Sequence, residues 1–101
     1  MSLNQFQKRH LRQLAHDLRP VVQTGGRGLT EAVLAEMDRA LQDHELIKVR
    51  LVADDRQQRR EMIETACERT GAELVQRIGH VAVLYRPNPE QPRVSAQLGK
   101  S

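Results

Sequence analysis

Residues 21–30 read VVQTGGRGLT, a short apolar run followed by three glycines and then by the start of a segment with helical periodicity. Glycine at positions 25 and 28 permits positive φ angles and leaves no Cβ to obstruct a ligand, so successive backbone N–H groups can turn toward an anion. A helix beginning near Thr30 would direct its positive dipole end to the same point. Arg27 adds a cation to the loop, and the stretch therefore predicts a strand-to-helix connection that can hold a phosphate.

Several glycine motifs can be compared with this loop, and spacing excludes two of them. The P-loop pattern requires a lysine and a hydroxyl directly after its last glycine, whereas Gly28 is followed by Leu29 and Thr30. A dinucleotide-binding fingerprint requires a third glycine that is absent here. Two interpretations are left: a tight strand-to-helix turn without a ligand, and the two-glycine clamp that KH modules place on a nucleic-acid backbone.

The charge of the chain is arranged in zones. The 101 residues carry a formal net charge of +3 and a pI near 9.6, which favours a polyanionic partner. Residues 1–28 hold five basic and one acidic side chain, residues 29–47 one basic and five acidic, and residues 48–60 five basic and two acidic. The length fits one small domain with its own core. Positive charge is thus concentrated before and after an acidic segment.

Cysteine content and the N-terminal residues bear on the compartment. A single cysteine, Cys67, cannot form an intramolecular disulfide or complete a cysteine-rich metal site, which favours a reducing compartment. No apolar stretch has the length of a membrane span, and residues 1–4 lack the apolar core of a signal peptide. We therefore expect a cytoplasmic protein without a membrane partner.

A first helix is predicted over residues 4–18, with Pro20 ending it. Its apolar positions recur at spacings of three and four residues and are Leu11, Leu14, Ala15 and Leu18. A second stripe, on the far side, is basic, has Lys8 beside it and consists of Arg9, Arg12, His16 and Arg19. Such a stripe is either a solvated face or a contact for a polyanion. Its position just before the glycine loop favours the contact.

The remaining elements follow from periodicity and capping residues. They are strands at 21–24, 46–52, 73–78 and 81–86, and helices at 30–44 and from Asp54 or Asp55 to about Thr70. Thr30 is the expected N-cap of the second helix, whose polar face is acidic, and Gly71 is expected to end the third. In strand 46–52, Lys48 and Arg50 alternate with apolar residues and form a second basic surface.

The element order α-β-α-β-α-β-β predicts a two-layer α+β domain over residues 1–87, with a four-stranded mixed sheet. Strands joined through helices favour parallel neighbours, while the last two strands form an antiparallel hairpin around Gly79 and His80. Pro87, Pro89 and Pro92 end the domain. Residues 88–101 are predicted to be a disordered polar tail.

Several of these segments together resemble a known family. They are residues 14–23 (LAHDLRPVVQ), 25–30 (GGRGLT), 44–49 (HELIKV), 78–79 (IG) and 84–86 (LYR). The combination closely resembles the CRM domain (chloroplast RNA splicing and ribosome maturation) in its stand-alone bacterial form, YhbY, over roughly residues 3–87.

The resemblance implies a fold similar to the C-terminal domain of translation initiation factor three, and binding to structured RNA. In bacteria it also implies association with precursors of the large ribosomal subunit. The family's glycine loop maps onto Gly25–Gly28, where the usual pattern has lysine at position 26 and often asparagine at 27. This chain has Gly26 and Arg27, so the positive charge is displaced by one residue.

Two other classes of function are weighed against RNA binding. An enzyme is disfavoured, because the four histidines show no metal-ligand spacing and no nucleophile–base arrangement. A protein-interaction module using the acidic face of the second helix or the sheet is the alternative. Phe6 and Tyr85 are the only Phe, Tyr or Trp residues, so few side chains can stack on bases. Recognition is therefore expected to depend on the backbone and the shape of the RNA.

The sequence therefore predicts a non-catalytic protein that binds large-subunit ribosomal RNA, with no metal, no cofactor and no small-molecule substrate. The predicted RNA-binding residues are Lys8, Arg9, Arg12, His16, Arg19, Gly25, Gly26, Arg27, Gly28, Thr30, Lys48 and Arg50.

Overall fold

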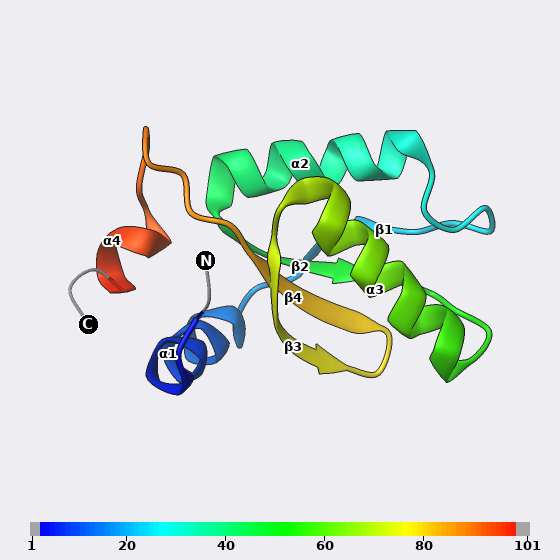
Figure 1. Cartoon of the computed structure of the whole chain (residues 1–101), viewed down its shortest axis with the longest axis horizontal. Coiled ribbons are helices and arrows are strands. Elements are labelled where there is room, and N and C mark those ends of the chain that lie inside the picture. The colour runs from blue at the N-terminus through cyan, green and yellow to red at the C-terminus, as the bar shows by residue number, and fades with distance from the viewer. Residues whose placement is uncertain (1–2, 99–101) are drawn as a thin grey trace.

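A four-stranded mixed sheet organises the chain (Figure 1). The structure is a computed structural model, and it describes residues 3–98. The strands are β1 (Pro20–Gln23), β2 (Leu46–Arg50), β3 (Glu73–Ile78) and β4 (Val81–Tyr85), in the spatial order β1-β2-β4-β3. β1 and β2 are parallel, whereas β4 is antiparallel to both of its neighbours. The predicted α+β class with a four-stranded mixed sheet is confirmed.

The main core lies between the sheet and two helices, α2 (Glu31–His44) and α3 (Arg56–Thr70). Alternate residues of the strands enter this core, including Ile47 and Val49 of β2 and Ala82 and Leu84 of β4. Cys67 of α3 packs against the cluster. Burial, together with the charge on Glu73, raises the pKa of the Cys67 thiol, which suits the core position predicted for it.

The opposite face of the sheet is partly covered by α1 (Gln5–Ala15) and by the short helix α4 (Val94–Leu98). A second cluster forms there from buried residues of α1, β2, β3 and β4, namely Leu11, Ala15, Leu46, Val75, Val83 and Tyr85. The predicted two-layer arrangement accounts for the sheet and the layer formed by α2 and α3. The helices α1 and α4 form a third layer on the other face of the sheet. Because α1 spans only 11 residues, the end of this face near Arg50 stays open.

Helix boundaries follow the capping residues. Thr30 accepts a hydrogen bond from the Val33 amide at 3.1 Å, which confirms the predicted N-cap of α2. Of the two candidates for α3, Asp54 and Asp55, Asp55 is the N-cap and accepts a hydrogen bond from the Gln58 amide at 2.8 Å. Gly71 ends α3 with a φ of 76°. The helix predicted over residues 4–18 spans Gln5–Ala15, with Asn4 as its N-cap. The prediction extends three residues too far at the C-terminal end, where a turn follows Ala15 and the Leu18 amide donates to the Ala15 carbonyl at 3.0 Å.

The segment after β4 carries hydrogen bonds and the helix α4, which contradicts the predicted disorder for residues 88–98. Residues 99–101 of the predicted tail lie outside the described residues. Glu45, which is 0% exposed, holds this segment in place. Its carboxylate accepts hydrogen bonds from the backbone amides of Asn88, Arg93 and Ser95 and from the Ser95 hydroxyl. Val94 and Leu98 then pack on the α1 side of the sheet. The composition of this segment predicted a polar tail. Its backbone amides, however, donate hydrogen bonds to the buried carboxylate of Glu45, which lies 43 or more positions earlier in the chain.

Within residues 3–98, every helix is too short or too polar to cross a membrane.

Candidate nucleic-acid interface

The basic stripe of α1 and a lysine of β2 come together in one surface groove, which we call the basic groove. Four of its lining residues have basic side chains: Arg9, Arg12, His16 and Lys48. Gln13, Ala15, Gln76 and Ile78 complete the lining. The groove therefore unites two surfaces that the sequence could only predict separately.

Strand alternation explains why Lys48 faces α1. Leu46 packs in the α1-side cluster, so Lys48, two residues further along β2, lies on the same face of the sheet. α1 ends before it would cover this position, and the Lys48 Nζ donates to the His16 carbonyl at 3.4 Å. Arg50 follows on the same face and is exposed. β2 thus carries two cations across the part of the sheet that α1 leaves open.

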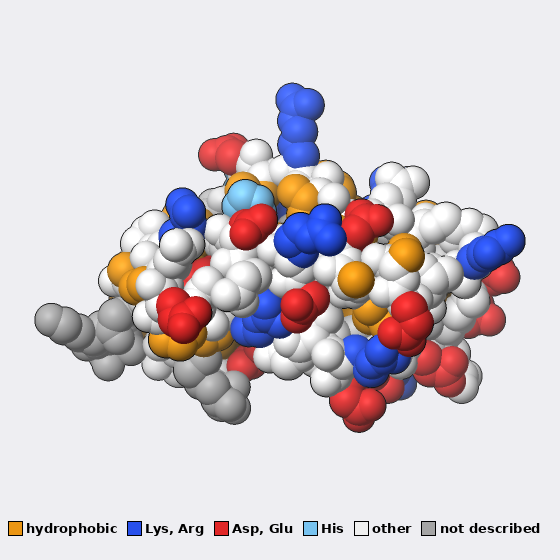
Figure 2. Space-filling view, turned by 90° about the horizontal axis from the view of Figure 1, so that it is seen from above, with side chains coloured by type: hydrophobic (Ala, Val, Ile, Leu, Met, Phe, Trp, Pro, Cys, Tyr) orange, Lys and Arg blue, Asp and Glu red, His pale blue; other side chains and the backbone are white. Residues whose placement is uncertain are grey.

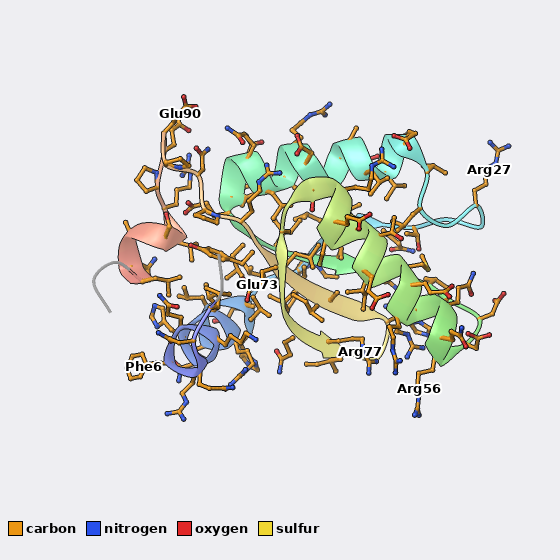
Figure 3. All side chains as sticks on the ribbon, viewed as in Figure 1. Phe6, Arg27, Arg56, Glu73, Arg77 and Glu90 are labelled. Atoms are coloured by element: carbon orange, nitrogen blue, oxygen red, sulfur yellow. The ribbon has the colours of Figure 1, made fainter. Side chains whose placement is uncertain are left out.

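The glycine loop forms a tight turn in which the Gly28 amide donates to the Gly25 carbonyl at 3.1 Å. Among the three glycines of the loop, Gly28 alone has a positive φ, at +71°, so the positive φ that glycine permits at position 25 is not used. A Cβ built at position 25, 26 or 28 meets nothing within 4 Å, which means that the space around the turn is open. Arg27 stands at the tip and points away from the domain (Figure 3).

The start of α2 lies next to this turn. The Thr30 side chain is engaged in capping, and its hydroxyl oxygen accepts from Val33. Glu31, the first residue of α2, would repel a phosphate, but Arg69 of α3 pairs with it at 2.6 Å. The hydrogen bond from Arg69, together with the charge of Arg69, lowers the pKa of Glu31. The ion pair therefore balances the one acid in the first turn of the helix.

The glycine loop and the basic groove lie apart along the 40 Å long axis of the molecule. Figure 1 shows the loop projecting beyond the sheet at one end, with α1 toward the other. β1 and β2 connect them: Gln23 is in register with Arg50, and the Thr24 amide donates to the Arg50 carbonyl at 2.9 Å. Arg50 is thus next to the base of the loop. A long polyanion could follow β2 from the groove to the loop.

Two predicted residues fall outside this arrangement. Arg19 follows the end of α1 and lines a different groove, beside β1. Lys8 is half-buried and does not line the basic groove. The helical stripe inferred from spacing therefore holds for Arg9, Arg12 and His16, and breaks where the helix ends.

Three further arginines gather at a place that the sequence analysis did not single out. Arg56 and Arg60 of α3 and Arg77 of β3 line a small cavity together with Glu64, and Figure 3 shows Arg56 and Arg77 on these two elements. The basic excess of residues 48–60 was a signal for the first two. Acidic residues of α3 are close by, so positive charge is less concentrated here than in the basic groove.

The α2 side of the molecule has a different character. Figure 2 views this side and shows acidic and basic side chains interspersed, without a continuous basic area. Arg86 is engaged in structural contacts: its Nη1 bonds Asp38 and the Thr70 carbonyl, each at 2.7 Å, and so ties α2 to the end of α3. Across residues 3–98, His, Cys, Asp and Glu side chains form no group of three or more that could hold a metal ion.

The fold and these surfaces define a small α+β domain with a glycine turn and an extended basic face, a class of domain suited to polyanions. The sequence matches the family model of the CRS1 / YhbY (CRM) domain over residues 3–86. The chain belongs to this family, as its sequence motifs suggested.

Relatives and a solved structure agree with the assignment. A probable RNA-binding protein of Pseudomonas aeruginosa is 47% identical over 90 residues, which are 89% of this chain and 86% of the relative. An RNA-binding protein of Haemophilus influenzae is 51% identical over 89 residues, 88% of this chain and 90% of the relative. The solution structure of a hypothetical Staphylococcus aureus protein, proposed there to bind RNA, is similar with a TM-score of 0.78 and 40% identity, covering 89% of this chain and 94% of that one.

Proposed function

We propose that this protein binds structured RNA without catalysing a reaction on it. The observation that carries the proposal is the convergence of Arg9, Arg12, His16 and Lys48 in one groove that β2 connects to an open glycine turn. Arginine and lysine neutralise phosphates, and exposed backbone amides of a turn add hydrogen bonds to them. Relatives that match nearly the whole chain are named as RNA-binding proteins, which supports the same conclusion.

Backbone and shape recognition fits the side chains that are present. Tyr85 is 3% exposed and belongs to the core, while Phe6 is 76% exposed on α1 and does not line the basic groove. The protein therefore has no aromatic platform of the RRM type on its sheet. Phosphate contacts along a folded RNA are the interaction that the basic groove and the glycine turn offer.

We further propose that the RNA belongs to precursors of the large ribosomal subunit and that binding assists their assembly in the cytoplasm. This proposal rests on the family resemblance, with its implied association with such precursors. In the proposed mechanism, the turn Gly25–Gly28 and Arg27 hold a phosphate while Arg9, Arg12, Lys48 and Arg50 neutralise its neighbours. Binding would help the precursor to reach or keep its folded shape.

The salt dependence of binding tests the basic groove. Each phosphate neutralised on a duplex steepens the fall of log affinity with log salt by about 0.9. Replacing Arg9 and Arg12 together by glutamine should therefore flatten the slope by roughly two units, measured by titration of a labelled RNA hairpin at several salt concentrations. The matched control replaces Arg39 and Arg56 by glutamine, which removes the same charge from exposed positions of α2 and α3 outside the proposed contacts. Equal slopes for the two double variants would contradict the groove assignment.

Sedimentation tests the ribosomal part of the proposal. The protein should sediment with large-subunit precursors at low salt, be scarce on translating ribosomes and leave the precursors at high salt, because phosphate contacts weaken with salt. Gradient fractions of a cell lysate, probed with an antibody, measure this. The Arg9→Gln/Arg12→Gln variant should shift toward the top of the gradient. Parent protein found only at the top at low salt would overturn the ribosomal proposal and favour a protein-interaction module.

A further inference from the structure

A second groove lies beside the basic groove, between the end of α1, the edge strand β1 and the C-terminal segment; we call it the apolar groove. It has a volume of about 430 Å³, within the range of small-molecule sites. Its walls are formed mainly by apolar side chains of four elements and connections: Leu14, Leu18, Val21, Leu46, Ile47 and Val94. Leu18 and Val21 are 38% and 51% exposed, so the groove opens to solvent.

The polar part of this lining is basic. Arg19, His44, Lys48 and Arg93 line the groove together with the neutral Gln97, and among residues 3–98 no acidic side chain lines it. Three permanent cations, Arg19, Lys48 and Arg93, around an apolar floor favour an anionic ligand that has an apolar or planar part. The charge thus indicates what kind of ligand the groove fits.

Lys48 lines both the apolar groove and the basic groove, so the two adjoin at this side chain. An RNA strand whose phosphates occupy the basic groove would pass directly beside the apolar one. Planar guanidinium and imidazole groups such as those of Arg19, Arg93 and His44 can stack on a nucleobase, while aliphatic side chains cover its faces. Continuity with the basic groove therefore favours a nucleotide over an acidic peptide.

We propose that the apolar groove binds the base of one unpaired nucleotide adjacent to the duplex that the basic groove holds. The inference rests on the proposed RNA binding and adds to it a site for a base. It also gives the C-terminal segment a role, because Arg93, Val94 and Gln97 form one wall and lie beyond residues 3–86, which match the family. The Glu45 carboxylate holds that wall in place through the amides of Arg93 and Ser95.

Two RNA hairpins that differ only in one unpaired residue test this site. The unpaired residue is 2-aminopurine, whose fluorescence reports its environment. The parent chain should bind the bulged hairpin roughly five-fold more tightly than the fully paired one, the lower end of what base contacts contribute. The Leu18→Asn/Val21→Thr variant should lose this preference and the fluorescence change, while keeping the affinity for the paired hairpin and the salt slope.

Both substituted side chains are exposed, and a thermal melt verifies that the variant folds. Val52→Thr is the matched control, because Val52 is 44% exposed and lines neither groove. A parent that binds both hairpins equally, or a variant that keeps the preference, would overturn the base site and leave the proposed RNA binding intact. Methyl NMR signals of Leu18, Val21 and Val94 that do not shift on addition of the bulged hairpin would likewise overturn the base site. Absence of salt-dependent binding to either hairpin would instead overturn the proposed function.

Discussion

Replacing Gly28 by aspartate is expected to weaken RNA binding by about ten-fold or more, since hydrogen bonds to charged groups contribute about 1.5–3 kcal/mol and a carboxylate would repel the phosphate. The glycine has a φ of +71°, which side chains rarely adopt, so the substitution also strains the turn. Nothing lies within 4 Å of the new Cβ, so the domain should still fold. Titration of a labelled RNA hairpin and a thermal melt measure the two effects.

Two companion variants separate charge from strain. Gly26→Asp places the same charge in the turn at a position without a positive φ, and it should weaken binding nearly as much. Gly71→Asp introduces the same strain at a φ of +76°, but at the end of α3, and it should lower stability without a comparable loss of RNA affinity. A Gly28→Asp protein that melts cooperatively and binds RNA like the parent would contradict the phosphate clamp.

The second large effect is expected at Glu45. Glu45→Gln should lower the free energy of unfolding by about 1.5–3 kcal/mol, because it replaces a charged acceptor by a neutral amide whose NH₂ group faces other donors. The affected donors are the amides of Asn88, Arg93 and Ser95 and the Ser95 hydroxyl. Urea unfolding measures the total loss. Faster hydrogen exchange in residues 88–98 should locate it in the C-terminal segment.

Two further variants separate the role of the Glu45 carboxylate from the backbone strain at this residue. Glu45 has a φ of 66° without being glycine, a conformation that costs about 1–2 kcal/mol. Glu45→Gly removes this strain together with the carboxylate and should release the segment as Glu45→Gln does. Glu36→Gln, an exposed position of α2, the helix that ends just before Glu45, should change neither stability nor exchange. Unchanged exchange in both Glu45 variants would mean that the carboxylate does not hold the segment.

The pKa of Glu45 determines how the stabilisation of residues 88–98 depends on pH. Burial alone would raise the pKa of Glu45, but the hydrogen bonds from Asn88, Ser95 and Arg93 outweigh it, so the pKa lies below the ordinary value of 4.5. The unfolded chain therefore binds this proton more readily than the folded one. The stabilisation is complete above the ordinary value and is lost as the pH falls through the lowered pKa. The protection of the amides in residues 88–98, measured relative to their intrinsic exchange rate at each pH, should fall over that acid range in the parent and change less in Glu45→Gln.

Local features of the sequence predicted most elements correctly. The N-caps Thr30 and Asp55, the helix-ending Gly71 and the alternation of Lys48 and Arg50 with apolar residues depend on contacts within a few positions, and the structure contains each of them. The glycine turn was located for the same reason. Helix α1 was predicted too long because Leu18 continues the apolar spacing, although the chain tightens at Ala15.

Contacts between residues far apart in the sequence decided the features of the fold and of the interface that local sequence patterns did not predict. Charge pattern and spacing alone determined that this is a basic α+β domain with a glycine turn, because periodicity and capping are encoded over short stretches. Only the tertiary structure decided that Lys48 joins Arg9, Arg12 and His16, since this depends on where α1 crosses the sheet. It also decided that residues 88–98 are ordered, because their partner is a buried carboxylate brought close by the packing of α2 against the sheet. Composition reports the polarity of such a segment, whereas its order depends on whether the folded domain supplies hydrogen-bond partners for it.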